Sequence, residues 1–303
     1  MTNSTYQEVI NRLKKLDLYD IHITDNDSSL DYVFCDTKKV NVHSVSKMIT
    51  AICIGIAIEQ NIFPQGLDEP IMKYFQNTSI TNESNIQLLK NAKIKHLLSL
   101  TLGHEERLLD SQQISSLNES DLVEFILNYP IKHEPGTHFV YTSATMYLAS
   151  VIVTRATGCT LLEFAKKNLF SKLNITDVDW LESKQGFNLG ATGLIINGFD
   201  LHKIGLMILK DGKYDGYQIV SEQWINEMRT IQSLSSRYYN KERALPKYGY
   251  GFNLWICKNG TYFCDGTDGQ YVIMIPHKNR VITTVGNQKD MSYVTEYLRP
   301  ILE

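Results

Sequence analysis

The sequence predicts an α+β fold, in which an antiparallel sheet built from both chain ends is flanked by helices and carries an inserted all-helical lobe. Strand-like runs lie at residues 21–35 and 251–285, near the two ends of the chain. Between them, residues 61–190 carry apolar side chains at helical spacing. Because the chain has 303 residues, of which 43% are hydrophobic, it can bury a sizeable core as one domain.

The first lobe is expected to cover residues 1–43 and 190–303, approximately, and the helical lobe residues 44–189. The chain opens with an amphipathic pattern at residues 6–16, which predicts a helix. Strands at 21–24 and 32–35 follow, and then an apolar helix at 44–60. Its longest apolar run, 49–58, is about half a membrane span, so it predicts a buried core helix and no membrane segment.

Later elements are marked by caps and turns. Ser120, Thr160 and Ser221 are the predicted N-caps of three helices. Residues 251–257 and 261–264 flank Lys258-Asn259-Gly260, which is a hairpin signal. A second strand pair is predicted at 270–276 and 280–285, and a closing helix at 292–302, with Pro300 cutting into its end. The sheet therefore draws strands from both termini.

Charge and cysteine content exclude several classes of protein. The net charge is −3, so the chain has no basic excess for a phosphate backbone, and no nucleic-acid partner is expected. The five cysteines are scattered without a CxxC pair, which favours free thiols in a reducing compartment. The N-terminus shows no signal-peptide pattern, which favours a cytoplasmic location, or export if a leader has been removed.

A nucleophile and a base are suggested by Ser44 and Lys47, the one S-x-x-K in the chain. Their i, i+3 spacing places both on one face of a helix, with Ser44 at its start. There the helix dipole favours developing negative charge, and burial beside that positive end would depress the pKa of Lys47. A neutral amine can act as the general base for a hydroxyl. The alternative is an N-capping Ser with a surface Lys.

A phenol and a glycine-rich turn follow later in the chain. Tyr141 stands after the turn at Pro135-Gly136, before a helical stretch, where its hydroxyl could relay a proton; a core tyrosine is the alternative. Tyr238-Tyr239-Asn240 has a similar pattern but reads as a surface loop. The run from Cys264 to Gln270, between two strands, has glycines that permit close approach of a ligand, or that simply connect strands.

In this order, the three segments resemble the serine β-lactamase and penicillin-binding-protein superfamily, with its S-x-x-K, Y-x-N-type and K-T-G signatures. The distances of 97 and 123 residues between Ser44, Tyr141 and Cys264 are similar to those of the class C β-lactamase and esterase branch. Further ordered matches support the resemblance: residues 96–104 to LLxxTSG, 135–141 to PGxxFxY, and 193–205 to GL…DLxKxG. The resemblance implies the β-lactamase/transpeptidase-like fold over nearly the whole chain, as one catalytic domain.

The resemblance also implies roles for the site residues. Ser44 would be the nucleophile, Lys47 its base and Tyr141 the proton relay, while Ser143 stands where the branch usually has Asn. The backbone N–H groups of Ser44 and Thr267 would form the oxyanion hole.

The third motif departs from the pattern of penicillin-recognising members. Cys264 replaces a Lys or His, and Asp265 and Gly266 follow it. Since the missing cation holds a substrate carboxylate, and Asp265 would add repulsion, we expect weak binding of β-lactams and D-Ala-D-Ala peptides and better turnover of small neutral esters. The alternative is that another Lys or Arg reaches the pocket from a loop. The pattern is closer to that of aminohexanoate-oligomer hydrolases and esterases.

The sequence thus predicts a serine hydrolase that forms an acyl-enzyme with a small-molecule or peptide-like ester or amide. A penicillin-binding protein with D,D-peptidase activity, or a weak class C β-lactamase, is the alternative. A catalytically silent binding protein of the same fold is a third, against which the intact Ser44, Lys47 and Tyr141 argue. No cofactor or metal is expected, because the eight His show no HxH or HExxH cluster. Oligomeric state is not predicted.

Overall fold

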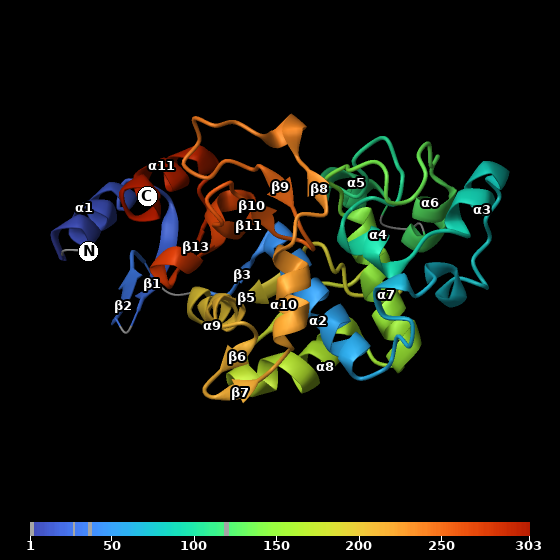
Figure 1. The fold of residues 1–303 in the computed structure, drawn as a ribbon, viewed down its shortest axis with the longest axis horizontal. Coiled ribbons are helices and arrows are strands. Elements are labelled where there is room, and N and C mark those ends of the chain that lie inside the picture. Colours follow the sequence, from blue (N-terminus) through green and yellow to red (C-terminus); the bar gives the residue numbers. More distant parts are fainter. Residues whose placement is uncertain (1–2, 27, 36–37, 118–120) are drawn as a thin grey trace. The chain divides into compact units, whose positions relative to one another are not determined.

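The computed structural model describes residues 3–26, 28–35, 38–117 and 121–303. The chain divides into two compact units (Figure 1). Unit 1 comprises Met1–Val45 and Leu194–Glu303, and unit 2 comprises Ser46–Gly193. The predicted lobe boundaries lie two and four residues earlier than these. That the chain forms one catalytic domain stays a prediction.

Unit 1 is built on an eight-stranded antiparallel sheet in the order β2-β1-β13-β12-β11-β10-β9-β8. The N-terminal strand β1 pairs with the C-terminal β13, with Ile23 opposite Ile282. A sheet formed from both chain ends was predicted from the sequence, and the structure confirms it. The strands are β1 (Leu18–Asp25), β2 (Ser28–Val33), β8 (Ser233–Leu234), β9 (Gly249–Tyr250), β10 (Trp255–Ile256), β11 (Tyr262–Gly266), β12 (Gln270–Ile275) and β13 (Arg280–Gly286).

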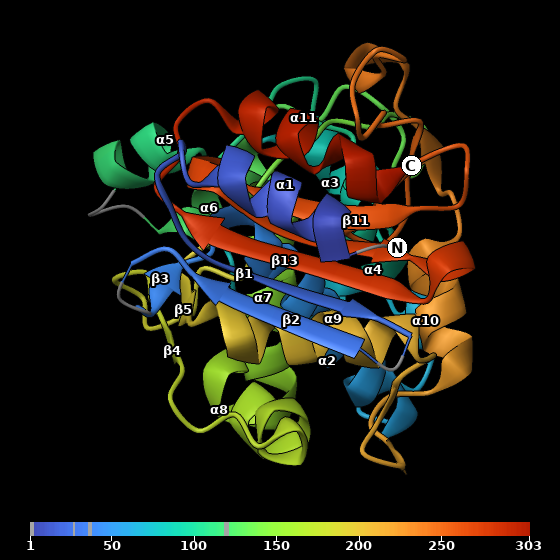
Figure 2. The same cartoon turned by 90° about the vertical axis from the view of Figure 1, so that its left-hand side faces the viewer.

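Helices cover both faces of this sheet (Figure 2). α9 (Gly198–Leu209) lies on one face, where a Cβ on Gly205 would come within 2.7 Å of Val272 and 2.8 Å of Val281. α1 (Asn3–Leu13) and α11 (Met291–Leu302) pack together on the other face, and Tyr271 donates its hydroxyl to the Met291 carbonyl. Neighbouring residues of β12 therefore face opposite layers, as the alternation of a strand requires.

Shorter elements complete unit 1. β3 pairs with β5, and β6 pairs with β7. Their bounds, with that of the remaining helix, are β3 (Val40–Asn41), β5 (Leu194–Ile196), β6 (Lys213–Tyr214), β7 (Tyr217–Gln218) and α10 (Glu222–Arg229).

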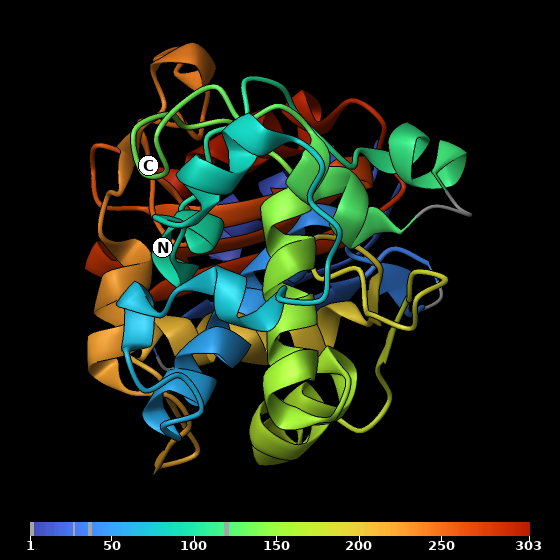
Figure 3. The same cartoon turned by 90° about the vertical axis from the view of Figure 1, so that its right-hand side faces the viewer.

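Unit 2 is predominantly helical, and α7 runs through the middle of its helices (yellow-green in Figure 3). Residues 46–57 of α2 and 144–153 of α7 are all buried. Helices that are apolar all round belong in a core, so α2 and α7 form the centre of this unit. The elements are α2 (Ser46–Glu59), α3 (Glu83–Leu89), α4 (Ile94–Leu98), α5 (Ser111–Ser116), α6 (Leu122–Asn128), α7 (Ala144–Thr157), α8 (Leu161–Ala165) and β4 (Asp179–Trp180).

Helix starts follow local chemistry. Thr160 accepts a hydrogen bond from the Glu163 N–H, and Ser221 accepts one from the Trp224 N–H, as predicted for N-caps. Ser120 lies outside the described residues, and Asp121 caps α6. Among the described helices, no single one is long and apolar enough to cross a membrane. The bent pair of α7 and residues 161–173 meets the length and composition of a membrane span only when the two segments are taken together.

Candidate active site

The predicted site residues are distributed over the two units. Unit 1 contains Ser44 together with Cys264, Asp265, Gly266 and Thr267, and unit 2 contains Lys47, Tyr141 and Ser143.

Ser44 lies in a single 3-10 turn, η1 (His43–Val45), which is followed directly by α2 at Ser46. His43 has a φ of 47°, and its N–H is donated to Asn41 Oδ1 at 2.9 Å. A left-handed backbone is costly for a residue with a side chain and persists where the surroundings enforce it. The chain thus turns sharply out of β3 just before Ser44, and Ser44 stands at the N-terminal end of the helical run.

Gly266, at the end of β11, lies against this turn. A Cβ on Gly266 would come within 2.3 Å of the Val42 carbonyl oxygen and 3.2 Å of His43 Cβ. Only glycine allows such close backbone approach. Thr267, the next residue, therefore begins the connection to β12 beside the segment that carries Ser44. Unit 1 thus places the end of β11 beside the segment that carries Ser44, and the joint role of Ser44 and Thr267 stays a prediction.

The connection after β11 is fixed by charged and polar side chains. Asp268, with a φ of 68°, lies 3.4 Å from His43 Nε2 and accepts from Lys289 Nζ at 2.8 Å. Burial lowers the pKa of His43 and the charge of Lys289 lowers it further, whereas Asp268 raises it. Gln270 donates to the Gly286 carbonyl at 2.8 Å and accepts from its N–H at 3.2 Å. His43 and Asp268 therefore position the site, and sequence reasoning missed both, because neither belongs to a reactive pattern.

Asp265 and Cys264 lie in different surroundings. Asp265 is ion-paired, since it accepts from Lys247 Nζ at 2.7 Å and from Trp255 Nε1 at 2.9 Å. Lys247, from the loop before β9, thus compensates the charge of Asp265, and repulsion of a substrate carboxylate by Asp265 stays a prediction. The Cys264 thiol is 3% exposed, and burial raises its pKa. Its side chain therefore belongs to the protein interior, and its role in substrate binding stays a prediction.

Lys47, in unit 2, is 1% exposed on the first turn of α2. Its Nζ donates to the Ala191 carbonyl at 3.2 Å and lies 4.9 Å from the centre of the Tyr141 ring. The neighbouring Thr50 donates to the Gly190 carbonyl at 2.7 Å, which holds residues 190–191 against α2. The structure thus brings Lys47 and Tyr141 together, and it removes the amine from water.

The Tyr141 ring has a second cation beside it. The guanidinium of Arg107 lies 5.7 Å from the ring centre. Leu108 is locked to Thr142, whose hydroxyl accepts from the Leu108 N–H and donates to its carbonyl, both at 3.0 Å. Arg107 is therefore held next to Tyr141. The sequence offered no signal for it other than its place in a loop.

The segment 96–104, which resembles a family motif, supports the approach to Tyr141. The Val140 N–H is donated to the Leu100 carbonyl at 3.2 Å, and the Gly136 N–H to the Thr101 carbonyl at 2.8 Å. Gly103 has a φ of 110°, and a Cβ there would come within 2.1 Å of the His133 carbonyl oxygen. This motif therefore serves as a scaffold for Tyr141.

Ser143 occupies the N-cap position of α7, two residues after Tyr141. Its side chain does not cap the helix, and within the described part of the chain its Oγ has no hydrogen-bond partner. The hydroxyl is half-buried and can accept or donate a hydrogen bond to a ligand.

A further group in unit 2 has ligand types suited to a divalent cation. The ligand atoms of Glu105, His133 and His138 all lie within 4.8 Å of one another. His133 is hydrogen-bonded to Glu105 at 2.5 Å, which lowers the pKa of that carboxyl, and the two imidazoles stack with centres 4.0 Å apart. Imidazole and carboxylate ligands suit Zn²⁺.

Comparison with known proteins adds the family. The beta-lactamase family model matches residues 37–299. The 6-aminohexanoate-dimer hydrolase of Paenarthrobacter ureafaciens is 25% identical over 178 residues, which are 56% of this chain and 44% of that protein. Lovastatin esterase of Penicillium rubens is 30% identical over 150 residues, 44% of this chain and 37% of that protein. The chain thus matches less than half the length of these curated relatives.

A solved structure supports the fold. A penicillin-binding protein from Bacillus halodurans superposes with a TM-score of 0.73, over all of both chains, at 17% identity. At this identity the likeness concerns the fold alone, and it confirms the predicted β-lactamase/transpeptidase-like architecture.

Proposed function

Because the chain belongs to the beta-lactamase family, we propose that it is a serine hydrolase that cleaves an ester or amide through an acyl-enzyme at Ser44. The two curated relatives are named for an amide and an ester substrate, which supports this substrate class. The observation that carries the proposal is the buried Lys47, which stands three residues after Ser44 with its Nζ beside the Tyr141 ring.

In the proposed acylation, Ser44 Oγ attacks the carbonyl carbon and gives its proton to the neutral amine of Lys47. The bond from the carbonyl carbon to the leaving oxygen or nitrogen then breaks. Tyr141 donates its hydroxyl proton to the leaving group and recovers one from Lys47. Water attacks the resulting ester in the same way, which releases the acid and restores Ser44.

Two features of the residues suit this chemistry. Lys47 is 1% exposed, and desolvation favours the uncharged form of an amine, which is the form a base requires. The oxyanion would be held by the backbone N–H groups of Ser44 and Thr267, and each such donor contributes roughly 3 kcal/mol to transition-state stabilisation. The close approach of Gly266 to Val42 supports this pairing of donors.

The test is covalent labelling by a fluorophosphonate, followed by intact-protein mass spectrometry. We expect one adduct on the wild-type protein and none on Ser44→Ala. Ser46→Ala, which removes the neighbouring hydroxyl, is the matched control and should label fully. Full labelling of Ser44→Ala would contradict the assignment of the nucleophile.

Penicillin G and p-nitrophenyl butyrate separate the competing activities. Turnover of the ester with no stable penicillin adduct supports the proposed ester or amide hydrolase. A long-lived penicillin adduct would instead indicate a penicillin-binding or D,D-peptidase activity, and rapid penicillin turnover a β-lactamase. No adduct with the fluorophosphonate or penicillin G, together with no turnover of p-nitrophenyl butyrate, would indicate a silent binding protein.

A further inference from the structure

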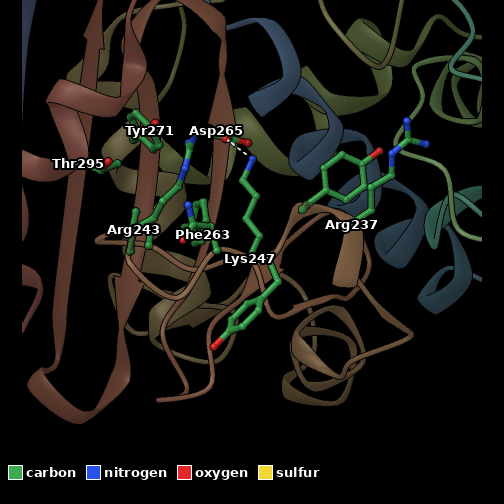
Figure 4. A pocket seen from close by; sticks show the side chains of 11 residues that line it. Arg237, Arg243, Lys247, Phe263, Asp265, Tyr271 and Thr295 are labelled. Atoms are coloured by element: carbon green, nitrogen blue, oxygen red, sulfur yellow. Dashed lines mark hydrogen bonds and ion pairs between the residues drawn. The ribbon is translucent and has the colours of Figure 1, made fainter.

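Asp265 borders a cavity of about 360 Å³ that lies entirely within unit 1. Three elements line it: the loop 237–247, the paired strands β11 and β12, and α11. Figure 4 shows the side chains of Arg243 and Lys247 extending toward Asp265, with Arg237 on the far side of Lys247. Tyr271 and Thr295 complete the wall beside Arg243.

The cavity carries an excess of positive charge. Three cations, Arg237, Arg243 and Lys247, line it against one carboxylate. Lys247 is engaged by Asp265 at 2.7 Å, and its Nζ lies 4.2 Å from the centre of the Trp255 ring. Within the described part of the chain, neither Arg237 nor Arg243 is in an ion pair. Arg243 lowers the pKa of Asp290 at longer range, so that carboxylate offsets part of its charge, but no carboxylate of the described residues pairs directly with either guanidinium.

The loop that carries these cations is anchored at several points. The Ala244 N–H is donated to Glu296 at 3.2 Å, and Arg299 donates to the Glu242 carbonyl at 2.8 Å, so α11 holds the loop next to Arg243. Ser235 donates to the Lys247 carbonyl at 2.6 Å at the base of the loop. A ligand would therefore meet cations that are already placed, which reduces the entropic cost of binding.

The cavity lies close to the proposed oxyanion donor. Asp265, on β11, precedes Thr267 by two residues, and Thr267 begins the turn directly after the strand; two residues of extended chain span about 7 Å. The guanidinium of Arg243 points to the Asp265 end of the cavity (Figure 4). A substrate whose carbonyl oxygen is bound by the Thr267 N–H could therefore place a second group in the cavity across a spacer of a few carbon atoms.

We propose that this cavity binds a carboxylate of the substrate through Arg243, so that the preferred substrate is a half-ester or half-amide with an anionic group a few carbons from the scissile carbonyl. The proposal rests on the proposed function, and it replaces the expected preference for neutral esters. Arginine is suited to this role because its fork of N–H donors matches a carboxylate. Lys247, held by Asp265, adds charge nearby, and Arg237 adds charge at the rim.

The experiment compares kcat/KM for p-nitrophenyl glutarate, whose acyl group ends in a carboxylate, with that for neutral p-nitrophenyl pentanoate. Each value is divided by the rate of hydroxide-catalysed hydrolysis of the same ester. A second pair, 4-carboxyphenyl butyrate and phenyl butyrate, places the anion on the leaving group. We expect the anionic ester to be favoured about tenfold in one of the two pairs.

Variants assign the preference. Arg243→Gln should lower the anionic-to-neutral ratio about tenfold, and Arg237→Gln about two- to threefold, because a rim charge acts through a longer, screened distance. Lys213→Ala removes an exposed cation of unit 1 from outside the cavity and should leave the ratio unchanged. Equal rates for both members of both pairs, or a ratio that survives Arg243→Gln, would overturn the proposal.

A binding measurement separates this outcome from failure of the proposed function. If none of the four esters is hydrolysed, glutarate binding to the Ser44→Ala protein is measured by calorimetry, with pentanamide as the neutral control. Glutarate binding that is lost in the Ser44→Ala, Arg243→Gln double variant supports the carboxylate site even where the hydrolase proposal fails. Absence of glutarate binding would overturn it.

Discussion

The two units hold their candidate catalytic groups in opposite kinds of surroundings. In unit 2, Lys47 is almost fully buried and meets a backbone carbonyl and an aromatic ring. In unit 1, the residues around the end of β11 form ion pairs, Asp265 with Lys247 and Asp268 with Lys289. The surroundings in unit 2 exclude water from the Lys47 amine. Those in unit 1 place paired positive and negative side chains around the turn that follows β11.

This difference predicts different responses to substitution. A buried base acts through proton transfer, so its loss should lower kcat and be insensitive to salt. Partly exposed ion pairs are screened by salt and contribute little individually, so their effects should be smaller and concern binding and positioning. The following experiments test whether the two units divide the work in this way.

The largest effect is expected in unit 2. Lys47→Ala should lower kcat/KM for p-nitrophenyl butyrate about a thousandfold, within the range typical of general-base catalysis. Tyr141→Phe should lower it less, and the double variant should be no worse than Lys47→Ala alone, because residues that act as a unit have non-additive effects. Circular dichroism checks that each variant is folded. Losses that multiply in the double variant would show that the two residues act independently.

In unit 1, the corresponding test concerns the backbone. Gly266→Ala would place a Cβ 2.3 Å from the Val42 carbonyl, which must displace either β11 or the segment carrying Ser44. We expect kcat to fall about a hundredfold, comparable to loss of an oxyanion donor.

Gly251→Ala is the matched control, since its Cβ would come within 2.1 Å of the Met228 carbonyl, elsewhere in unit 1. Both variants should lose about 1–3 kcal/mol of unfolding free energy, but the control should retain kcat. Equal loss of kcat in both would mean that Gly266 acts through stability alone.

The sequence predicted the bounds of some elements closely and those of others less well. Periodic apolar runs located β12, β13 and α11, whose bounds lie within one residue of expectation, because alternation and helical spacing survive in the folded state. β2 was expected at 32–35 but covers Ser28–Val33, since pairing with β1 sets its length. The caps Thr160 and Ser221 were predictable because they bond within three residues.

Long-range pairing of side chains could not be predicted. The partner of Asp265, Lys247, is 18 residues away, and no local pattern connects the two. Arg107 reaches Tyr141 only because Leu108 bonds to Thr142, 34 residues later. Ser44, Lys47 and Tyr141 could be proposed from the sequence because they stand in short motifs, whereas the cations beside Asp265 and Tyr141 depend on the tertiary fold.

Two buried histidines, one in each unit, should respond to pH in opposite directions. Burial alone would lower the pKa of His22, but the carboxylate of Asp20, 3.2 Å from Nε2, and a hydrogen bond between Nδ1 and Asp31 outweigh it, so this pKa is raised. His22 therefore contributes stability that is present below its unfolded value of about 6.5 and is lost as pH rises through the folded pKa. Burial lowers the pKa of His104 to about 4, so its contribution is present above 6.5 and is lost as pH falls toward 4.

The prediction is measured by urea unfolding at pH 5.5 and pH 8. His22→Gln should cost more stability at pH 5.5 than at pH 8, and His104→Gln more at pH 8 than at pH 5.5. For His104 the difference should be about 1.4 kcal/mol, because pH 5.5 lies about one pKa unit below the unfolded value. If both variants show pH dependence of the same sign, carboxylate partners do not distinguish the two histidines.

The smallest effect is expected at the exposed edge of unit 1. Lys289 is 73% exposed and pairs with Asp268, which also faces His43. Lys289→Ala should change the unfolding free energy by less than about 0.5 kcal/mol, as is usual for exposed ion pairs.

Since Lys289 contributes to the lowered pKa of His43, its removal should raise that pKa toward the ordinary value, whereas Asp268→Asn should lower it further. Titration of the His43 ring by NMR, at low and at high salt, measures both shifts. A His43 pKa that stays unchanged in Lys289→Ala would show that burial and Asp268 alone set the charge next to Ser44, and that the Lys289 ion pair does not reach the site.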